Sequence, residues 1–357
     1  MIKQILSLKT VSRTTKVSVH SNREQVLLVN IRHTDEELNS CSNVIGQFEL
    51  RKKSVLNELK RAHIDLKDIG IIVCRGGVLK PINGGIYSVN EAMIKDLHKP
   101  MAEHESNLGA LIAYDLAKMS ENNIKAITVD PACTDEMEPI AKISGMPEIK
   151  RKSIMHTLSQ RTVAKNYASI IGKDYEDCNI IVAHLGSGIS VGAHYKGKII
   201  DVNNGLNGDG SMSPARSGNV PAGQLIELCF SGKYTEDEMM KKTYLNGGLK
   251  GYLGTSDAIE VEKRIEKGDE EAKFIYKVIA YQLAKEIGAL ATVFKGKVDG
   301  ILITGGMAYS NIIMEDVTER VGFIAPVRIY PGEREMEGLA ENAYKVLNEK
   351  TEVIEYK

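Results

Sequence analysis

Two glycine-rich turns are the segments of this sequence best suited to chemistry. The turn at 185–188, Leu-Gly-Ser-Gly, directly follows an apolar run, and the turn at 304–307, Thr-Gly-Gly-Met, separates a second apolar run from a helical pattern. Glycines at such turns let backbone N–H groups approach an anion closely. A helix N-terminus after the second turn would add partial positive charge. A plain hairpin or strand-to-helix turn would have the same composition, so phosphate binding and a purely structural turn both stay open.

Charged side chains lie beside turns of this kind. Arg75 precedes two glycines at the end of an apolar run, and Arg216 stands among small residues. A guanidinium held in this way can bind phosphate or carboxylate through two parallel hydrogen bonds. Asp130 ends another predicted strand, where α/β enzymes gather catalytic groups, and His104 and His184 are expected near the same edge. For any one of these residues a solvated or structural role is more common, so the group as a whole indicates the site.

The polar loop 203–210 resembles a calcium loop in composition only. It lacks the glutamate that closes an EF-hand, and no helix precedes it. We expect this loop to line a cleft instead. The sequence contains no G-x-S-x-G elbow, no Walker A loop and no H-E-x-x-H motif.

The elements that must position these residues alternate between strand and helix patterns, which is typical of an α/β fold. Three short strands follow one another near the start of each half of the chain, a weak internal repeat in architecture but not in residue identity. A capping box of Thr34 and Glu37 predicts a helix start. The predicted strands are 5–8, 16–20, 26–32, 69–74, 126–129, 179–184, 189–195, 198–202 and 300–304, and the other predicted helices are 105–121, 154–171 and 269–294.

Length and composition exclude several classes of protein. At 357 residues the chain is expected to form roughly two domains. Its 46 basic and 47 acidic residues argue against a nucleic-acid partner. No apolar run approaches the roughly 20 residues of a membrane helix, and the first residues do not resemble a signal peptide. Five cysteines without a C-x-x-C pair fit reduced thiols in a cytoplasmic protein and no structural zinc site.

Taken in order, these motifs closely resemble the butyrate kinases of the acetate kinase family, within the sugar kinase, Hsp70 and actin superfamily. The match covers nearly the whole chain, which also resembles butyrate kinases in being shorter than typical acetate kinases. The motifs that carry the resemblance are Arg75-Gly76-Gly77, Gly84-Gly85, Glu103-His104, Ser106-Asn107-Leu108-Gly109, Val129-Asp130-Pro131, Asp135-Glu136-Met137, Arg151-Lys152-Ser153-Ile154, Ala183-His184-Leu185-Gly186-Ser187-Gly188-Ile189-Ser190, Asp201-Val202-Asn203-Asn204, Gly208-Asp209-Gly210, Arg216-Ser217-Gly218, Leu253-Gly254-Thr255-Ser256-Asp257 and Thr304-Gly305-Gly306.

The resemblance implies an α/β fold of duplicated actin-like, ribonuclease H-like domains, each with a mixed sheet flanked by helices, and a cleft between them. It places the N-terminal domain at 1–148, with a C-terminal helix 336–357 packing back on it, and the C-terminal domain with the nucleotide site at 149–335. It further implies an ATP-dependent transferase that phosphorylates a short-chain carboxylate, most simply butyrate, to an acyl phosphate and ADP. A homodimer or higher homo-oligomer is expected, without nucleic-acid or membrane partners.

The same resemblance assigns roles to individual residues. Arg75 and Arg216 would bind the carboxylate and the transferring phosphoryl group, His184 would hydrogen-bond the phosphoryl oxygens, and Asp130 would orient the site or its Mg²⁺. Glu335 would help to hold Mg²⁺. The residues expected to bind or lie near ATP are Ser12, Thr15, Lys16, Gly186, Ser187, Gly188, Asn207, Gly208, Asp209, Gly305 and Gly306.

These residue types suit the reaction. A carboxyl group with a pKa of about 4 to 5 is already anionic at neutral pH and needs no general base. The obstacle is repulsion between this anion and a triphosphate. Guanidinium groups, a histidine and Mg²⁺ would offset the repulsion and stabilise the charge that develops on the transferring group.

The first loop departs from the family pattern Asn-Pro-Gly-Ser-Thr-Ser-Thr-Lys. Residues 9–16 are Lys-Thr-Val-Ser-Arg-Thr-Thr-Lys, so Ser12, Thr15 and Lys16 are kept and five of the eight positions differ: 9, 10, 11 and 13, and position 14, where threonine replaces serine. We expect Val11 to crowd an approaching phosphate, and Lys9 and Arg13 to add positive charge there. The altered loop favours an alternative from another class, a nucleotide- or metabolite-binding protein on the same scaffold with impaired catalysis.

Overall fold

The computed structural model describes residues 3–100, 103–122, 124–348 and 350–357. The chain divides into two compact units: unit 1, Met1–Thr134 with Arg334–Lys357, and unit 2, Asp135–Glu333. The boundary predicted from the sequence lies at 148/149. Residues 135–148 group with unit 2 because they form hydrogen bonds with Ile199 and Ile200 of that unit. The Glu136 carboxylate accepts a hydrogen bond from the N–H of Ile199 at 3.0 Å, and the N–H of Glu138 donates to the carbonyl of Ile200 at 2.9 Å.

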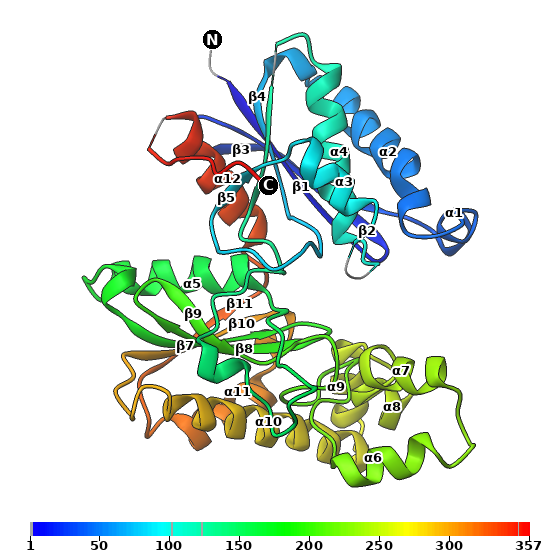
Figure 1. The fold of residues 1–357 in the computed structure, drawn as a ribbon, viewed down its shortest axis with the longest axis vertical. Helices are drawn as coiled ribbons and strands as arrows, with labels where there is room; N and C mark the ends of the chain where they lie inside the picture. Colours follow the sequence, from blue (N-terminus) through cyan, green and yellow to red (C-terminus); the bar gives the residue numbers. More distant parts are fainter. Residues whose placement is uncertain (1–2, 101–102, 123, 349) are drawn as a thin grey trace. The chain divides into compact units, whose positions relative to one another are not determined.

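Unit 1 is built on a six-stranded mixed sheet in the order β3-β2-β1-β4-β6-β5 (Figure 1). The first three strands pair antiparallel, β1 to β4 and β4 to β6 are parallel, and β5 is antiparallel to β6. The strands are β1 Gln4–Val11, β2 Thr14–Ser21, β3 Glu24–Arg32, β4 Ile69–Cys74, β5 Ile86–Ser88 and β6 Lys125–Val129.

Helices cover both faces of this sheet, with α2, α3 and α4 on one face and α12 on the other (Figure 1). The central strand β1 is therefore buried on both faces, and its alternate side chains point to different helices. Thr10 donates a hydrogen bond to the carbonyl of Glu105 beside α4, whereas Lys9 reaches the first residue of α12. The helices of unit 1 are α1 Asp35–Asn39, α2 Phe48–Arg61, α3 Glu91–Leu97, α4 Ser106–Met119 and α12 Glu335–Leu347, with short 3₁₀ helices η1 Ile45–Gln47 and η2 Leu66–Asp68.

Unit 2 has a five-stranded mixed sheet in the order β11-β10-β7-β8-β9. Three strands again pair antiparallel, and β10 lies parallel to both β7 and β11. The parallel pairing sets the carboxyl ends of β7 and β10 side by side, with Thr304 opposite His184. The strands are β7 Asn179–Leu185, β8 Ile189–Tyr195, β9 Lys198–Val202, β10 Gly300–Gly305 and β11 Val327–Pro331.

The sheet of unit 2 is also covered on both faces. Helix α5 packs on one face, and α10 and α11 lie on the other (Figure 1), where buried residues of α10 and α11 form one apolar core with β7, β8 and β10. The helices of unit 2 are α5 Thr157–Ile170, α6 Ala222–Cys229, α7 Glu236–Tyr244, α8 Gly248–Leu253, α9 Ala258–Glu266, α10 Glu270–Ala291 and α11 Asn311–Val321, with 3₁₀ helices η3 Pro139–Lys142, η4 Tyr175–Asp177 and η5 Gly306–Tyr309. No helix among the described residues is long and apolar enough to cross a membrane.

The predicted architectural repeat is confirmed. In both sheets a three-stranded antiparallel meander is extended on the side of its first strand by parallel strands, β4 and β6 in unit 1 and β10 and β11 in unit 2. The predicted capping box is also present, with the Thr34 N–H 2.9 Å from a Glu37 carboxylate oxygen and the Glu37 N–H 3.2 Å from Thr34 Oγ1.

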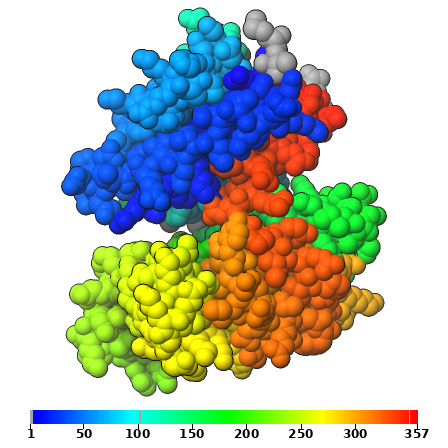
Figure 2. Space-filling view, turned by 180° about the vertical axis from the view of Figure 1, so that it is seen from behind, coloured from blue at the N-terminus to red at the C-terminus, as the bar shows by residue number. Residues whose placement is uncertain are grey.

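The C-terminal segment is only partly helical. Helix α12 ends at Leu347, ten residues before the predicted end at 357. Further along, Ile354 forms a bridge with Tyr87 of β5, so the chain end is extended against the sheet edge. Both parts belong to unit 1, and Figure 2 shows red residues of this segment beside the blue residues near the start of the chain.

Candidate active site

The first glycine turn joins β7 to β8 and is closed by a hydrogen bond of 3.0 Å from Gly186 N–H to the carbonyl of Gly188. A Cβ on Gly188 would collide with the carbonyl oxygen of Gly205. A Cβ on Gly186 would instead point toward two histidine rings, 3.5 Å from His184 Nε2 and 3.7 Å from His156 Nε2. The turn is therefore packed tightly on one side, and its other glycine opens toward imidazole nitrogens.

His184 and His156 form a stacked pair next to this turn. His184 lies on β7 and is 1% exposed, and the centroid of its ring is 4.0 Å from that of His156 with 20° between the planes. His156 precedes α5, and its Nδ1 lies 2.9 Å from Ser190 Oγ on β8, a hydroxyl that also accepts from Gln160. His156 is not among the predicted site residues, because its place depends on how α5 packs. The one local signal was a histidine at the start of a predicted helix.

Arg216 is brought to the same turn by a loop folded over it. The Ser213 hydroxyl donates to the Ser187 carbonyl at 2.7 Å and accepts from the Arg216 N–H at 3.2 Å. Arg216 Nε consequently lies 3.5 Å from the position of a Cβ on Gly188. Unit 2 thus gathers a guanidinium, two imidazoles and a glycine turn in one place, which is a donor set suited to an anion.

The second glycine turn lies at the end of β10, beside β7. Gly305 has a φ of 98°, and a Cβ there would collide with the backbone of Leu185, so only glycine fits. Gly306 has no other heavy atom within 4 Å of its Cβ position, which leaves it open. The predicted helix N-terminus does not follow directly. The turn enters the 3₁₀ helix η5, and α11 begins at Asn311 with its first turn already capped by the Ser310 hydroxyl.

The polar loop after β9 is folded on its own side chains. Asn203 is buried and accepts a hydrogen bond of 2.7 Å from the N–H of Val191. The Asp209 carboxylate accepts from the Asn204 N–H at 2.9 Å, and the Asn204 side chain in turn accepts from the N–H of Asn207 at 3.2 Å. Gly208 has a φ of 67°, with its Cβ position 3.6 Å from Ser217 Oγ, so the loop adjoins the residue after Arg216.

In unit 1, Arg75 follows β4 and shares a carboxylate with a lysine. The two distances to Glu335 Oε2 are 2.7 Å from Lys9 Nζ and 3.6 Å from Arg75 Nη1. Lys9 and Glu335 are 1% and 2% exposed, and Arg75 is 14% exposed. The expectation that Lys9 adds charge toward a phosphate is therefore overturned, because its ammonium is buried against Glu335.

Asp130 ends β6 in a left-handed conformation with a φ of 42°. Its carboxylate accepts the N–H of Gly85 at 2.9 Å, and its own N–H donates to the Gly85 carbonyl at 3.0 Å. A left-handed aspartate at a strand end costs energy that the surrounding contacts must offset. These reciprocal bonds fix Asp130 to Gly85, the second residue of the 84–85 glycine pair.

The first loop is a two-residue turn, Ser12 and Arg13, between β1 and β2. Of residues 11–14, all within the described chain, none has a positive φ, so Val11 does not need glycine's conformational freedom. The fully buried Arg51 guanidinium donates to the carbonyls of Val11 and Ser12 at 3.0 and 2.7 Å. Arg13 pairs with Asp35 at 3.0 Å on the surface. The loop is thus well formed, and hydrogen bonds from Arg51 to its carbonyl groups hold it in place.

The polar residues after this turn have different surroundings. Thr15 is fully buried, and its hydroxyl lies 3.1 Å from Arg51 Nη1 and 3.0 Å from His33 Nε2. Ser12 is exposed at the turn, and Lys16 is half-buried on β2. Ser12 and Lys16 therefore present accessible polar groups, whereas the Thr15 hydroxyl is committed to the interior.

The donor set at Glu335 does not fit a magnesium ion. Magnesium prefers oxygen ligands at short distance, but this carboxylate faces an ammonium and a guanidinium that would repel a divalent cation. Among the described residues, no group of three or more His, Cys, Asp and Glu side chains is placed to hold a metal.

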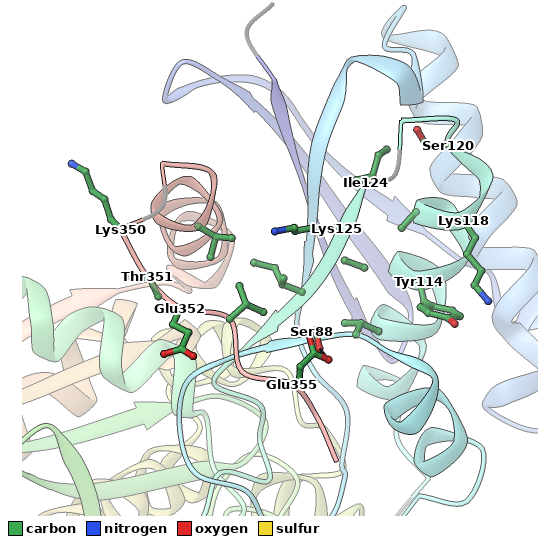
Figure 3. Close-up of a pocket in the computed structure, with 16 residues that line it drawn as sticks. Ser88, Tyr114, Lys118, Ser120, Ile124, Lys125, Lys350, Thr351, Glu352 and Glu355 are labelled. Atoms are coloured by element: carbon green, nitrogen blue, oxygen red, sulfur yellow. Dashed lines mark hydrogen bonds between the residues drawn. The ribbon is translucent and has the colours of Figure 1, made fainter.

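A separate groove of about 1040 Å³ lies along the β5–β6 edge of unit 1 (Figure 3). Its sixteen lining residues include none of the predicted site residues. The charged residues drawn there are Lys118, Lys125, Lys350, Glu352 and Glu355, which mix both signs. Neither its composition nor its location connects this groove to the chemistry above.

Comparison with known proteins gives consistent results. The family model described as "Acetokinase family" matches residues 15–330. The chain is 49% identical over 355 residues to "Butyrate kinase 2" from Clostridium acetobutylicum, which covers 99% of each sequence. This similarity favours the kinase interpretation over a binding protein without catalysis.

Solved structures show the fold. An acetate kinase from Porphyromonas gingivalis superposes with a TM-score of 0.74 at 19% identity, covering 97% of this chain and 100% of the other. A propionate kinase from Francisella tularensis subsp. tularensis gives 0.76 at 18% identity, covering 95% and 99%. The predicted duplicated actin-like arrangement of mixed sheets flanked by helices is confirmed.

Proposed function

Because the chain belongs to the acetokinase family, we propose that it is an ATP-dependent carboxylate kinase that converts butyrate and ATP to butanoyl phosphate and ADP. The observation that carries the proposal is the 49% identity to a butyrate kinase over 99% of both sequences. It favours a four-carbon acid over acetate.

The chemistry proposed is an in-line phosphoryl transfer. A carboxylate oxygen of the substrate attacks the γ-phosphorus of ATP, the new O–P bond forms, and the bond to the leaving ADP oxygen breaks. The attacking group is already ionised at neutral pH, so the protein needs to supply positioning and positive charge rather than a base.

Unit 2 supplies the donors proposed for the transferring phosphoryl group. Arg216 Nε and the Nε2 atoms of His184 and His156 all lie close to the glycines of the 186–188 turn. Cationic and N–H donors fixed before the reaction stabilise charge on the equatorial oxygens as it develops. We assign His156 to this group because it lies beside the same glycine as His184.

The nucleotide is assigned to the two glycine turns of unit 2. Parallel pairing of β7 with β10 sets Gly186 and Gly306 at adjacent strand ends. Gly306 is open at its Cβ position, whereas a Cβ on Gly186 would be in contact with the Gly188 carbonyl oxygen and two imidazole nitrogens. Backbone N–H groups at such turns suit phosphate oxygens. Ser187, Gly188, Asn207, Gly208, Asp209 and Gly305 complete this proposed region of unit 2. In unit 1, Ser12 and Lys16 are proposed separately as phosphate-binding groups, whereas Thr15 is not, because its hydroxyl is committed to Arg51 and His33.

Arg75 is assigned to the substrate carboxylate, and Asp130 to orienting that part of unit 1. Arg75 is 14% exposed, so its guanidinium is mostly buried while still reachable. Asp130 holds Gly85 through two hydrogen bonds. Magnesium is proposed as the companion of ATP, bound by phosphate oxygens and water, and not by Glu335.

A homo-oligomer and a cytoplasmic location belong to the same proposal. Helix α6 has no buried residue, and Ile226 within it and Phe230 directly after it are 52% and 88% exposed. Exposed apolar surface of this kind suits a second copy of the chain.

All five cysteines are free thiols, which is typical of a reducing compartment.

Trapping the acyl phosphate with hydroxylamine tests the function directly. The chain is incubated with ATP, Mg²⁺ and acetate, propionate, butyrate or isobutyrate, with Arg216→Ala as the matched control. We expect a hydroxamate with butyrate that the control does not form. ATP binding by calorimetry without hydroxamate from any acid would instead establish the binding-protein alternative.

A further inference from the structure

A lysine is buried in the central strand of unit 1. Alternation along β1 points Lys9 toward α12, and the side chain is 1% exposed. A lysine is almost never fully buried unless it is paired. Its ammonium lies 2.7 Å from Oε2 of Glu335, the first residue of α12, which is itself 2% exposed. The two charges therefore depend on each other.

The same carboxylate oxygen also faces Arg75. The Nη1 atom of Arg75 lies 3.6 Å from Glu335 Oε2, so one buried oxygen lies between an ammonium and a guanidinium. The N-terminus of the 13-residue helix α12 adds partial positive charge at this end. The surroundings of Glu335 are thus already positive without any metal.

We propose that Lys9 serves as a built-in cation at Glu335. It excludes a divalent metal from this carboxylate and, through it, acts as a positioning residue for Arg75. The inference rests on the proposed function only in giving Arg75 the substrate carboxylate to hold. The exclusion of metal follows from the ion pair alone.

Manganese binding in the absence of ATP and carboxylate tests this without relying on activity. Electron paramagnetic resonance counts the Mn²⁺ bound to the full chain and to Glu335→Gln, which keeps the shape of the side chain. We expect the two to bind equally. A manganese site of the parent that Glu335→Gln loses would overturn the proposal, and this comparison needs no Lys9 variant to fold.

Removing the lysine should then create the site. We expect Lys9→Asn to gain a manganese site, with an affinity at least about 10-fold above the parent, and Lys9→Asn/Glu335→Gln to lose it again. Lys53→Asn, which removes an exposed lysine from α2, controls for the change in net charge. A folded Lys9→Asn that binds no more Mn²⁺ than the parent would overturn the role of Lys9.

The positioning role has its own readout. If Lys9 holds Arg75 through Glu335, Lys9→Asn should raise KM for the carboxylate several-fold while leaving KM for ATP near that of the parent. Equal effects on both KM values would overturn the positioning role. An enzyme without kinase activity in any form would refute the proposed function and leave the manganese result standing.

Discussion

The imidazole rings of His156 and His184 stack face to face, with centroids 4.0 Å apart and planes 20° from parallel. The stacking fixes both rings beside the glycines of the 186–188 turn. The pair therefore presents two ring nitrogens at the 186–188 turn.

This pairing makes His156 as important as His184 for turnover. We expect His156→Ala and His184→Ala each to lower kcat by about 100-fold, and the double variant to fall little further because the rings act as one unit. Steady-state kinetics measure this, with the exposed His98→Ala as control. Parent-like turnover in His156→Ala would remove it from the site.

The two arginines should affect turnover far more than folding. We expect Arg75→Ala and Arg216→Ala each to lower kcat by about 100-fold or more, since each loses a charge-assisted contact made mainly in the transition state. Arg75→Lys should not restore kcat, because an ammonium group lacks the planar guanidinium that can form two parallel hydrogen bonds. Thermal unfolding shows whether the fold is intact, and a near-parent kcat in either alanine variant would refute the role of that arginine.

Arg51 should be a major source of stability for the first hairpin. Its buried guanidinium donates to the carbonyls of Val11, Ser12 and Thr14. Arg51→Met leaves these partly buried carbonyl groups without their guanidinium donor, and we expect the free energy of unfolding to fall by about 3 kcal/mol. Urea denaturation measures the change, with the exposed Arg61→Met as control. A loss no larger than that of the control would contradict the proposed clamp.

His194 should make the protein less stable in acid. Burial, together with the charge of Arg161, lowers the pKa of His194 to about 3. In the unfolded chain the pKa of the ring is about 6.5. Unfolding therefore takes up a proton between these values, so stability is greatest above pH 6.5 and falls as the pH decreases toward 3.

The effect can be isolated with His194→Gln. Between pH 6 and pH 4, we expect the free energy of unfolding to fall more steeply for the parent than for His194→Gln. The difference between the two slopes should be up to about 1.4 kcal/mol per pH unit. Urea denaturation at several pH values measures the two slopes. Identical slopes would show that His194 is not the group responsible.

The sequence predicted the fold well where the signal is local. Alternating apolar residues and tight turns mark the meander in each half, and Ile69–Cys74 and Ile189–Tyr195 match their predicted bounds. Placement of Arg75, Asp130 and His184 at strand ends followed from the same pattern. These features depend on residues that are neighbours in the chain.

Features set by distant residues were not predictable. Lys9 appeared to be a cation of the first loop because nothing near it in the sequence reveals Glu335, 326 positions later. His156 reaches the glycine turn only because α5 packs on β7. The 3₁₀ helix after Gly306 likewise follows from the pairing of Gly305 with Gly332, whose N–H and carbonyl groups exchange hydrogen bonds.

The return of residues 334–357 to unit 1 also sets an order for biosynthesis. A nascent chain that ends near residue 333 contains all of unit 2 but lacks the α12 helix that covers one face of the unit 1 sheet. At about 5–20 residues per second, the ribosome therefore completes the second unit before the first. Until Glu335 has been synthesised, Lys9 lacks the carboxylate with which it pairs in the core. The sheet of unit 1 can therefore be completed only after α12 has been made.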